Sequence, residues 1–433
     1  MKQAMGKEKI KIGLIGCGTI GGGVLTILKE NGAGISEKID AELVLAGVAE
    51  RSQARLEELE VPVVLRTDDA ESLLVDPDID IIIELIGGIE PARGFIRKAL
   101  ENGKYVVTAN KDLIATHGGE LLALAREKGL NIFYEASVGG GIPLIRPLKQ
   151  GLLADRLNRV VGIVNGTTNY ILTRMSQDGL GFEEALSLAQ ELGFAEADPT
   201  SDVEGRDAVY KLIIMAGLAF GKRVHPDNVC VEGIIKVTKD DIAYAREIGY
   251  AVKLVAIGER LPEGVALRVH PTLVPLDHPL ASVRNEFNAV LIEGEALGDV
   301  MFYGRGAGSM PTATAVLADV AEAARLIKEE STSCVIEKTI TDCVPLPLDQ
   351  LESRFYLRFL ADDRPGVFAA LANAFGDEQV SLDMVIQKRR VNNTAEIVLV
   401  THLAREDAFK RALDKVVALP AIKPGPSMFR LLG

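Results

Sequence analysis

The chain has 433 residues, a length that predicts two or three domains, each able to bury a core of its own. Hydrophobic residues make up 48% of the chain and charged residues 25%, which is typical of a globular protein and excludes a disordered one. The formal net charge of −13 argues against nucleic acid or an anionic membrane as a partner. No apolar run reaches the length of about 18 residues that a membrane span requires, so no membrane association is expected.

The cysteines and the first residues bear on the compartment. Four cysteines are scattered along the chain without the close spacing of a zinc site, and they predict reduced thiols and no disulfide framework. The first residues pass from charged side chains directly into a β-type run, so no signal peptide is expected. These observations predict a cytoplasmic protein.

A glycine pattern follows the first predicted strand, at 10–15, and leads into a helix. Its residues are Gly16, Cys17, Gly18, Thr19, Ile20 and Gly21. In this G-x-G-x-x-G order Gly16 forms the tight turn, Gly18 lets the backbone approach a pyrophosphate, and Gly21 allows close packing of helix and strand. The position between a strand and a helix predicts a Rossmann-type site for NAD or NADP. The alternative is a glycine-rich turn without a ligand.

The second predicted strand, at 41–50, ends where the adenosine ribose of a dinucleotide would lie. A carboxylate there favours the 2′-hydroxyl of NAD, whereas a nearby arginine can hold the 2′-phosphate of NADP. Glu50 and Arg51 stand side by side and give both signals. The choice between NAD and NADP therefore stays open at this point.

Three further predicted strands, at 79–88, 105–108 and 130–138, continue the buried parallel sheet. Open α/β sheets place ligands in the loops after their strands, so Lys111 is a candidate contact for cofactor and substrate. Taken alone, Lys111 would be interpreted as a solvated lysine at the start of a helix. Glu135, with the exposed carbonyls of the glycine turn after the last strand, could hold a monovalent cation. A purely structural turn is an equal alternative on these residues.

The sequence changes character beyond about residue 145. Long β-type segments at 264–275 and 288–304, with few helices between them, predict an α+β domain that carries the substrate chemistry. Its acidic stretch forms a loop that leads into an apolar helix at 206–221, with Asp207 and Lys211 on one face. A carboxylate and an amine presented together suit a polar substrate and a proton transfer. The alternative is an acidic surface loop followed by an ordinary ion pair.

The C-terminal third begins with a second glycine-rich loop, at 303–309, and a helix. The loop is predicted to bring the backbone close to the nicotinamide, with a plain interdomain turn as the alternative. Prolines at 345 and 347 predict a linker at 341–353. Residues 354–433 then predict a small βαββαβ module. It contains no nucleophile–base pair, which favours binding and regulation over a second active site.

Together these patterns resemble the homoserine dehydrogenase family over essentially the whole chain. The resemblance rests on GCGTIGGG at 16–23, TANKDLI at 108–114, EASVGGGIPLI at 135–145, GIVNGTTNYIL at 162–172 and GFAEADPTSDVEGRDAVYK at 193–211. The C-terminal module resembles an ACT domain through LADDRPGVFAALANAF at 360–375.

The resemblance implies an α/β Rossmann-type cofactor domain, an α+β domain for substrate binding, catalysis and dimerisation, and an ACT-like regulatory domain. The expected boundaries are 1–144 for the cofactor domain, 145–310 for the substrate domain, 311–340 for a helix returning to the cofactor domain, 341–353 for the linker and 354–433 for the ACT-like domain.

The resemblance also implies roles for single residues. Lys211 and Lys111 fall on the family's active-site lysines, and Glu196 and Asp207 fall on its substrate-contacting acids. Its monovalent-cation site, for Na⁺ or K⁺, falls on Glu135 and the backbone of Val138, Gly140 and Ile142. Its cofactor contacts fall on Gly16, Gly18, Thr19, Ile20, Gly21, Lys111, Gly193 and Gly308, beside the Glu50–Arg51 pair. Ala49 stands where many members carry a basic residue, which bears on the use of NADP.

The implied reaction is the NAD(P)-dependent interconversion of L-homoserine and L-aspartate 4-semialdehyde, in threonine, methionine and isoleucine biosynthesis. Lys211 would exchange the proton of the reacting oxygen, and Glu196 and Asp207 would receive the substrate ammonium. The ACT-like domain implies feedback control by an amino acid, with threonine as the usual effector. The resemblance further implies a homodimer through the substrate domain, or a tetramer if the ACT-like domains pair.

Two alternatives come from other functional classes. A semialdehyde dehydrogenase acting through a thiohemiacetal would need a reactive cysteine, and Cys230 is the candidate in the substrate domain. A catalytically idle NAD(P)-binding sensor would read amino acids through its C-terminal module. The presence of Lys111, Glu196, Asp207 and Lys211 together argues against an idle site.

Overall fold

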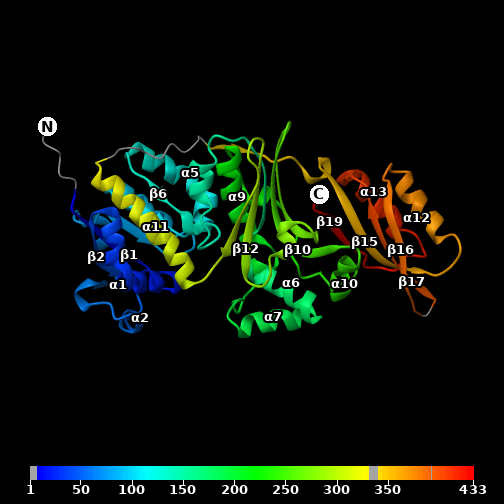
Figure 1. Cartoon of the computed structure of the whole chain (residues 1–433), viewed down its shortest axis with the longest axis horizontal. Coiled ribbons are helices and arrows are strands. Elements are labelled where there is room, and N and C mark those ends of the chain that lie inside the picture. The colour runs from blue at the N-terminus through cyan, green and yellow to red at the C-terminus, as the bar shows by residue number, and fades with distance from the viewer. Residues whose placement is uncertain (1–6, 331–339, 392) are drawn as a thin grey trace. The chain divides into compact units, whose positions relative to one another are not determined.

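A computed structural model describes residues 7–330, 340–391 and 393–433 of the chain (Figure 1). Packing divides the chain into two compact units. The first unit contains Met1–Val160, Tyr210–Asp227 and Asn288–Cys343, and the second contains Val161–Val209, Asn228–Phe287 and Val344–Gly433. Three elements, β7 (Leu157–Ile163), α9 (Arg206–Phe220) and β12 (Phe287–Gly294), each contain a boundary between the units. In the described ranges no helix is long and apolar enough to cross a membrane.

The first unit is built on a six-stranded parallel sheet in the order β3-β2-β1-β4-β5-β6. Its strands are β1 (Lys9–Ile15), β2 (Glu42–Ala49), β3 (Arg66–Thr67), β4 (Ile81–Glu84), β5 (Tyr105–Thr108) and β6 (Ile132–Phe133). β4 and β5 are buried along their whole length, as their unbroken apolar runs predict. The strand order reverses between β1 and β4, the position at which such sheets bind ligands.

Among the described residues, six helices lie wholly in the same unit, and α9 lies in it from Tyr210 onward. The six are α1 (Thr19–Ile39), α2 (Gln53–Glu58), α3 (Ala70–Val75), α4 (Ala92–Glu101), α5 (Lys111–Glu127) and α11 (Ser309–Lys328). A Cβ on Gly23 of α1 would lie 2.6 Å from Ser309 Oγ, so α1 and α11 pack closely at this point. The unit also contains β13 (Gly298–Arg305), and β8 (Lys222–Val224) paired in parallel with β14 (Thr341–Cys343).

Several expectations need adjustment. The strand expected at 130–138 is only two residues long, because the chain turns at Glu135–Ser137. The segment expected as a linker contains β14, which is paired with β8. Of the stretch 311–340, residues 331–339 lie outside the described residues, and Cys334 with them.

The second unit contains the strand series β10-β11-β19-β15-β17-β16. These strands are β10 (Tyr250–Leu261), β11 (Gly264–Pro275), β19 (Ser427–Leu431), β15 (Glu352–Asp362), β17 (Thr394–Thr401) and β16 (Leu382–Val391), with β9 (Cys230–Val231) beside β11 and β18 (Ala404–Arg405) beside β15. Its helices are α6 (Gly166–Asp178), α7 (Phe182–Glu191), α8 (Thr200–Val203), α10 (Lys239–Glu247), α12 (Val367–Gly376) and α13 (Glu406–Val417). Between β11 and β12 the chain has only a short 3-10 turn, Pro279–Ser282, in agreement with the few helices expected between the long β segments.

The C-terminal module has the predicted order β15-α12-β16-β17-α13-β19 (Figure 1). Helices α12 and α13 cover one face of its sheet, where Phe355, Phe375 and Phe409 meet in a buried apolar cluster. Its last strand, β19, pairs antiparallel with β15 and parallel with β11, so the module continues the sheet of the substrate domain.

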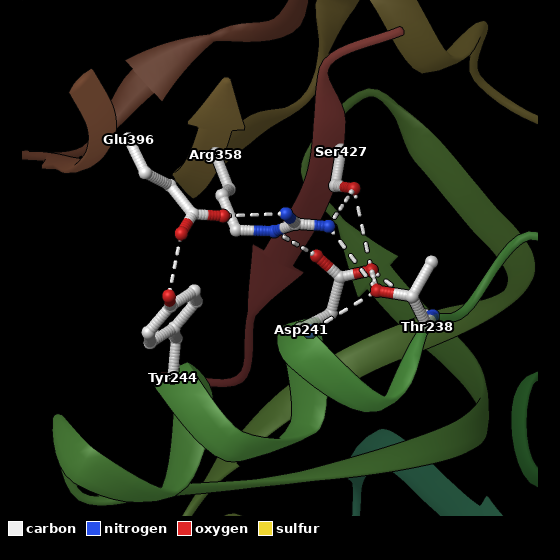
Figure 2. A network of polar contacts seen from close by, with 6 residues as sticks. All are labelled: Thr238, Asp241, Tyr244, Arg358, Glu396 and Ser427. Atoms are coloured by element: carbon white, nitrogen blue, oxygen red, sulfur yellow. Dashed lines mark hydrogen bonds and ion pairs between the residues drawn. The ribbon is translucent and has the colours of Figure 1, made fainter. Parts of the chain in front are cut away.

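A polar network occupies the opposite face of the module's sheet (Figure 2). Arg358 of β15 donates from Nε to Asp241 Oδ1 at 2.6 Å and from one terminal nitrogen to Glu396 Oε1 at 2.8 Å. Its other terminal nitrogen reaches Thr238 Oγ1 and Ser427 Oγ. Because Asp241 and Thr238 form the capping box of α10, one arginine ties the module to the start of a helix in the substrate domain.

Replacing Arg358 with Met should lower the stability of the second unit by about 3 to 5 kcal/mol, because the fully buried Asp241 would lose its charged partner. The measurement is urea unfolding followed by circular dichroism. Arg411→Met, which removes an exposed ion pair with Glu378 in the same module, is the matched control and should change little. Equal losses in the two variants would contradict the prediction.

Candidate active site

The glycine turn predicted to bind a dinucleotide lies between β1 and α1. Gly16 has φ of +94°, and a Cβ on Gly21 would lie 2.1 Å from the Gly16 carbonyl oxygen, so neither position tolerates a side chain. A Cβ on Gly18 would meet nothing within 4 Å. The turn is therefore closed on its inner side and open at Gly18, as a pyrophosphate-binding turn must be.

A hollow of about 550 Å³ lies beside this turn. Its walls come from the ends of β1, β2 and β4 and from the start of α4. The residues that line it are Ile15, Gly16, Gly18, Ala49, Glu50, Arg51, Asp68, Asp69, Ala70, Glu71, Leu85, Ile86, Gly87, Pro91 and Phe95. The hollow lies at the switch point of the sheet, and its size and lining fit an extended nucleotide.

Glu50 and Arg51 line this hollow in different ways. The Glu50 carboxylate accepts hydrogen bonds from Cys17 N at 2.8 Å and Ser52 N at 3.0 Å, and these bonds outweigh partial burial and lower its pKa. Arg51 is exposed, and Arg55 donates to the Cys17 carbonyl. Glu50 thus fixes the glycine turn as well as lining the nucleotide hollow.

Lys111 is the first residue of α5, and a buried network fixes the turn before it. Glu84, fully buried at the end of β4, accepts a hydrogen bond from Thr108 Oγ1 at 2.7 Å. Asn110 caps α5 and donates to the Gly88 carbonyl at 2.6 Å. Burial raises the pKa of Glu84. Lys111 itself is one-third exposed, so its amine is held at a rigid helix start with access to solvent.

The glycine run at 139–141 is fixed by two buried carboxylates. Glu135 accepts hydrogen bonds from the backbone N–H groups of residues 144, 145 and 146. Asp319 of α11 accepts from Glu135 N at 2.8 Å and Arg146 at 3.1 Å, and burial raises its pKa to about 7. The Glu135 carboxylate is therefore engaged with the protein backbone. The carbonyls of Val138, Gly140 and Ile142 accept no hydrogen bond from the described part of the chain.

The second glycine-rich loop lies against the first one. A Cβ on Gly140 would be 2.5 Å from the Gly306 carbonyl oxygen, so the two loops touch through backbone. Gly308, with φ of +117°, precedes α11, and Ser309 Oγ donates to the Thr19 carbonyl at 2.7 Å. This loop thus returns to the dinucleotide-binding turn.

The acidic stretch presents its carboxylates from a loop and the first turn of α9. Asp207 is 7% exposed, and Asn165 Nδ2 donates to Asp207 Oδ2 at 2.8 Å and to Asp202 Oδ1 at 2.6 Å. Lys211 follows Asp207 on the same helix face, one turn later. Glu196 is exposed in the loop after α7, and Gly193, with φ of +75°, ends that helix.

A buried lysine supports the same region. Lys253 of β10 is 4% exposed and donates to Asn169 Oδ1 at 3.0 Å and to the Val283 carbonyl. Burial lowers its pKa to about 8. Asn169 also donates to the carbonyls of Asn285 and Phe287, which anchors α6 in place.

Sequence reasoning missed Glu84, Asn165, Lys253 and Asp319. A charged residue at the end of a wholly apolar strand could have indicated Glu84, since such a group needs partners when buried. Asn165 stands directly before a helix, the preferred position of a capping residue. Nothing in the local pattern distinguishes Lys253 or Asp319 from surface residues.

Cys230 does not have the features of a catalytic nucleophile. It is partly buried, and burial raises its pKa, whereas a reactive thiol needs a lowered one. Within the described residues, no cluster of three or more histidine, cysteine and acidic side chains could hold a metal ion. The thiohemiacetal route therefore has no support in this substrate domain.

The glycine turn and the hollow beside it on a parallel sheet, with a lysine-bearing helix and an ACT-type module, indicate an NAD(P)-dependent oxidoreductase. The family model for homoserine dehydrogenase matches residues 143–321. The model for the homoserine dehydrogenase NAD-binding domain matches residues 16–135, and the model for the ACT domain matches residues 355–421. The chain belongs to the homoserine dehydrogenase family.

Named relatives agree over nearly the full length. Homoserine dehydrogenase from Synechocystis is 45% identical, covering 98% of this chain and 99% of the relative, and that from Bacillus subtilis is 40% identical with the same coverage. The crystal structure of a homoserine dehydrogenase from Thiobacillus denitrificans superposes with a TM-score of 0.93 at 40% identity, covering 99% of both chains. A hyperthermophilic archaeal homoserine dehydrogenase in complex with NADPH, 29% identical, gives a TM-score of 0.63 and covers 73% of this chain and 97% of its own.

Replacing Gly18 with Ala should leave the unfolding midpoint unchanged but weaken NAD(P)H binding at least tenfold, because the new methyl group occupies the space a pyrophosphate needs. Gly21→Ala should lower both stability and affinity, because its methyl group collides with the Gly16 carbonyl. Fluorescence titration with NAD(P)H and thermal unfolding measure the two effects. Unchanged affinity in Gly18→Ala would contradict this role of the turn.

The lowered pKa of Lys253 predicts a stability that rises with pH. Below about pH 8 the lysine is charged in the folded and the unfolded state, and the full cost of burying the charge is present. Between about pH 8 and 10.5 the unfolded chain binds more protons than the folded one. The free energy of unfolding therefore rises by about 3 kcal/mol over this range. Lys253→Met should lack this gain. The check is the difference in unfolding free energy between wild type and variant from pH 7 to 10.5, and a constant difference would refute it.

Proposed function

We propose that Lys211 exchanges the proton in the interconversion of L-homoserine and L-aspartate 4-semialdehyde, while Asp207 and Glu196 receive the substrate ammonium. The observation that carries this proposal is the buried Asp207 carboxylate, held by Asn165, one helical turn before Lys211. The first turns of one helix thus present a carboxylate, which can accept from a substrate ammonium, and an amine, which can exchange a proton with the reacting oxygen.

In the proposed reaction the hydride transfer belongs to the cofactor, and the protein exchanges the proton and positions the substrate. Bound NAD(P) would supply the hydride acceptor for the terminal carbon of the substrate. Lys211 takes the hydroxyl proton during oxidation and returns it during reduction, and Lys111 contributes positive charge near the reacting oxygen. Glu196 and Asp207 orient the substrate from its amino end, so that the reacting carbon is positioned rather than free to rotate.

The nucleotide site supports the use of both NAD and NADP. Glu50 is held near the expected ribose position, and the exposed Arg51 beside it is accessible to a 2′-phosphate. Thr19, Ile20, Gly193 and Gly308 complete the proposed cofactor contacts. Parallel assays with NAD and NADP measure the preference.

We also propose a site for Na⁺ or K⁺ at the carbonyls of Val138, Gly140 and Ile142. Their oxygens accept no hydrogen bond from the described residues, which supports this assignment. Glu135 contributes through its carboxylate, which accepts from the backbone of residues 144–146 and holds the turn in shape. Dependence of homoserine turnover on Na⁺ or K⁺, against a choline control, tests it.

We propose, from the presence of the ACT domain, that threonine inhibits the enzyme by feedback. We also propose that the enzyme acts in threonine, methionine and isoleucine biosynthesis. The feedback proposal is supported by the Arg358 network, which joins the ACT sheet to α10 (Figure 2). An effector that binds two states of the module differently could act through this connection. We further propose that the protein is cytoplasmic and that it forms a homodimer or tetramer. Light scattering of the purified protein measures the oligomeric state.

Lys211→Ala should reduce kcat for homoserine oxidation at least 100-fold with NAD(P)H affinity unchanged, because the proton acceptor is lost. Asp207→Ala should raise the KM for homoserine far more than the KM for NADP. Steady-state kinetics of both variants, with the exposed Lys239→Ala as control, measure these effects. An unchanged kcat in Lys211→Ala would eliminate the catalytic assignment.

Tyr244→Phe should leave activity without threonine unchanged and raise the threonine concentration for half-inhibition several-fold, because the variant removes the hydrogen bond from Tyr244 to Glu396 in the network. Inhibition curves of homoserine oxidation measure this. The control is Arg411→Met, which lies outside the network. Identical curves for wild type and Tyr244→Phe would exclude this route of communication.

A further inference from the structure

The side-chain amide of Asn165 lies between two carboxylates of the acidic stretch. Its nitrogen donates one hydrogen bond to Asp202 at 2.6 Å and one to Asp207 at 2.8 Å. Asn165 is 5% exposed, so water competes little for these bonds. Both amide hydrogens are therefore committed to the two acids.

The orientation of this amide is fixed from its other end. Asn165 Oδ1 accepts hydrogen bonds from Thr168 N at 2.8 Å and from Thr168 Oγ1 at 2.9 Å. A backbone N–H can only donate, so the oxygen must face Thr168 and the nitrogen must face the carboxylates. The amide cannot rotate by half a turn without losing all of these bonds.

The helix that Asn165 caps is itself anchored. Asn169, one turn further along α6, bonds to Lys253 and to the carbonyls of Asn285 and Phe287. Thr173 Oγ1 accepts from Asn285 N at 3.0 Å. Asn165, which donates to the two acids, therefore lies at the start of a helix that is anchored to β10 and to the loop before β12 in the same unit.

Two carboxylates held close together repel each other, and like charges disfavour ionisation. A neutral amide that gives one hydrogen to each acid reduces this repulsion, and the positive end of α6 acts in the same direction. The arrangement keeps two carboxylate acceptors in fixed positions.

We propose that Asn165 is a positioning residue that holds Asp207 and Asp202 in the geometry that receives the polar groups of the amino-acid substrate. The proposal rests on the proposed role of Asp207. It assigns substrate affinity to a residue that need not touch the substrate.

The test compares Asn165→Ser and Asn165→Asp with wild type and with Asp207→Ala. Serine and aspartate cap helices about as well as asparagine, so a purely capping role predicts wild-type behaviour in both variants. Positioning predicts a homoserine KM raised tenfold or more in Asn165→Ser, with a smaller change in kcat and none in the KM for NADP. In Asn165→Asp a third carboxylate replaces the donor, and kcat/KM should recover as pH falls, when one carboxyl takes up a proton.

The outcomes separate the two proposals. If Asp207→Ala raises the homoserine KM but Asn165→Ser does not, the role of Asn165 is overturned and that of Asp207 stands. If neither variant changes this KM, both assignments are overturned. If circular dichroism shows that the Asn165 variants do not fold, the test uses Thr168→Val, which removes the hydroxyl that helps to fix the amide. A raised homoserine KM in Thr168→Val supports the positioning role, and an unchanged KM overturns it.

Discussion

The burial of a carboxylate at the start of α9 is the constraint on which this account of the site depends. An ionised group removed from water must be compensated, and in the second unit the neutral amide of Asn165 contributes one hydrogen bond to Asp207. A neutral donor orients the acid and adds no charge of its own. The same solution recurs at Glu135, whose carboxylate is satisfied by three backbone N–H groups and thereby shapes the glycine turn that follows it. Buried acids in this chain thus set the positions of loops.

The ACT module is structurally continuous with the substrate domain. β19 pairs with both β11 and β15, and Arg430 of that strand is buried against Glu406 of the module and Glu232 of the substrate domain. On the other face, Arg358 bonds to the cap of α10. Deleting the module would therefore expose the edge of β11 and leave Glu232 and Asp241 without their arginine partners. Single substitutions are the sounder way to separate regulation from folding.

The local sequence pattern was sufficient to predict the elements that depend on residues close together in the chain. The glycine turn, the helix that carries Asp207 and Lys211, and the order of the C-terminal module are all found where the sequence predicts them. The strand expected at 130–138 is cut short because Glu135 bonds to backbone nine to eleven residues later, a contact that alternation of side chains cannot reveal. The contacts of Asn165 with the two acids and those of Lys253 were missed for the same reason, since these partners lie 30 to 84 residues away. The pairing of β19 with β11 joins residues more than 150 positions apart and leaves no local trace.

The most direct test of the central claim, that the acidic stretch selects the substrate by its ammonium group, is the ratio of kcat/KM for L-homoserine to that for 4-hydroxybutanoate with the wild-type enzyme. The two compounds share the reacting hydroxyl and differ by the amino group. Because 4-hydroxybutanoate offers no ammonium group to the carboxylates of Asp207 and Glu196, the account predicts a ratio of about 100 or more. A ratio near one would contradict it and would leave the acidic stretch without its assigned role.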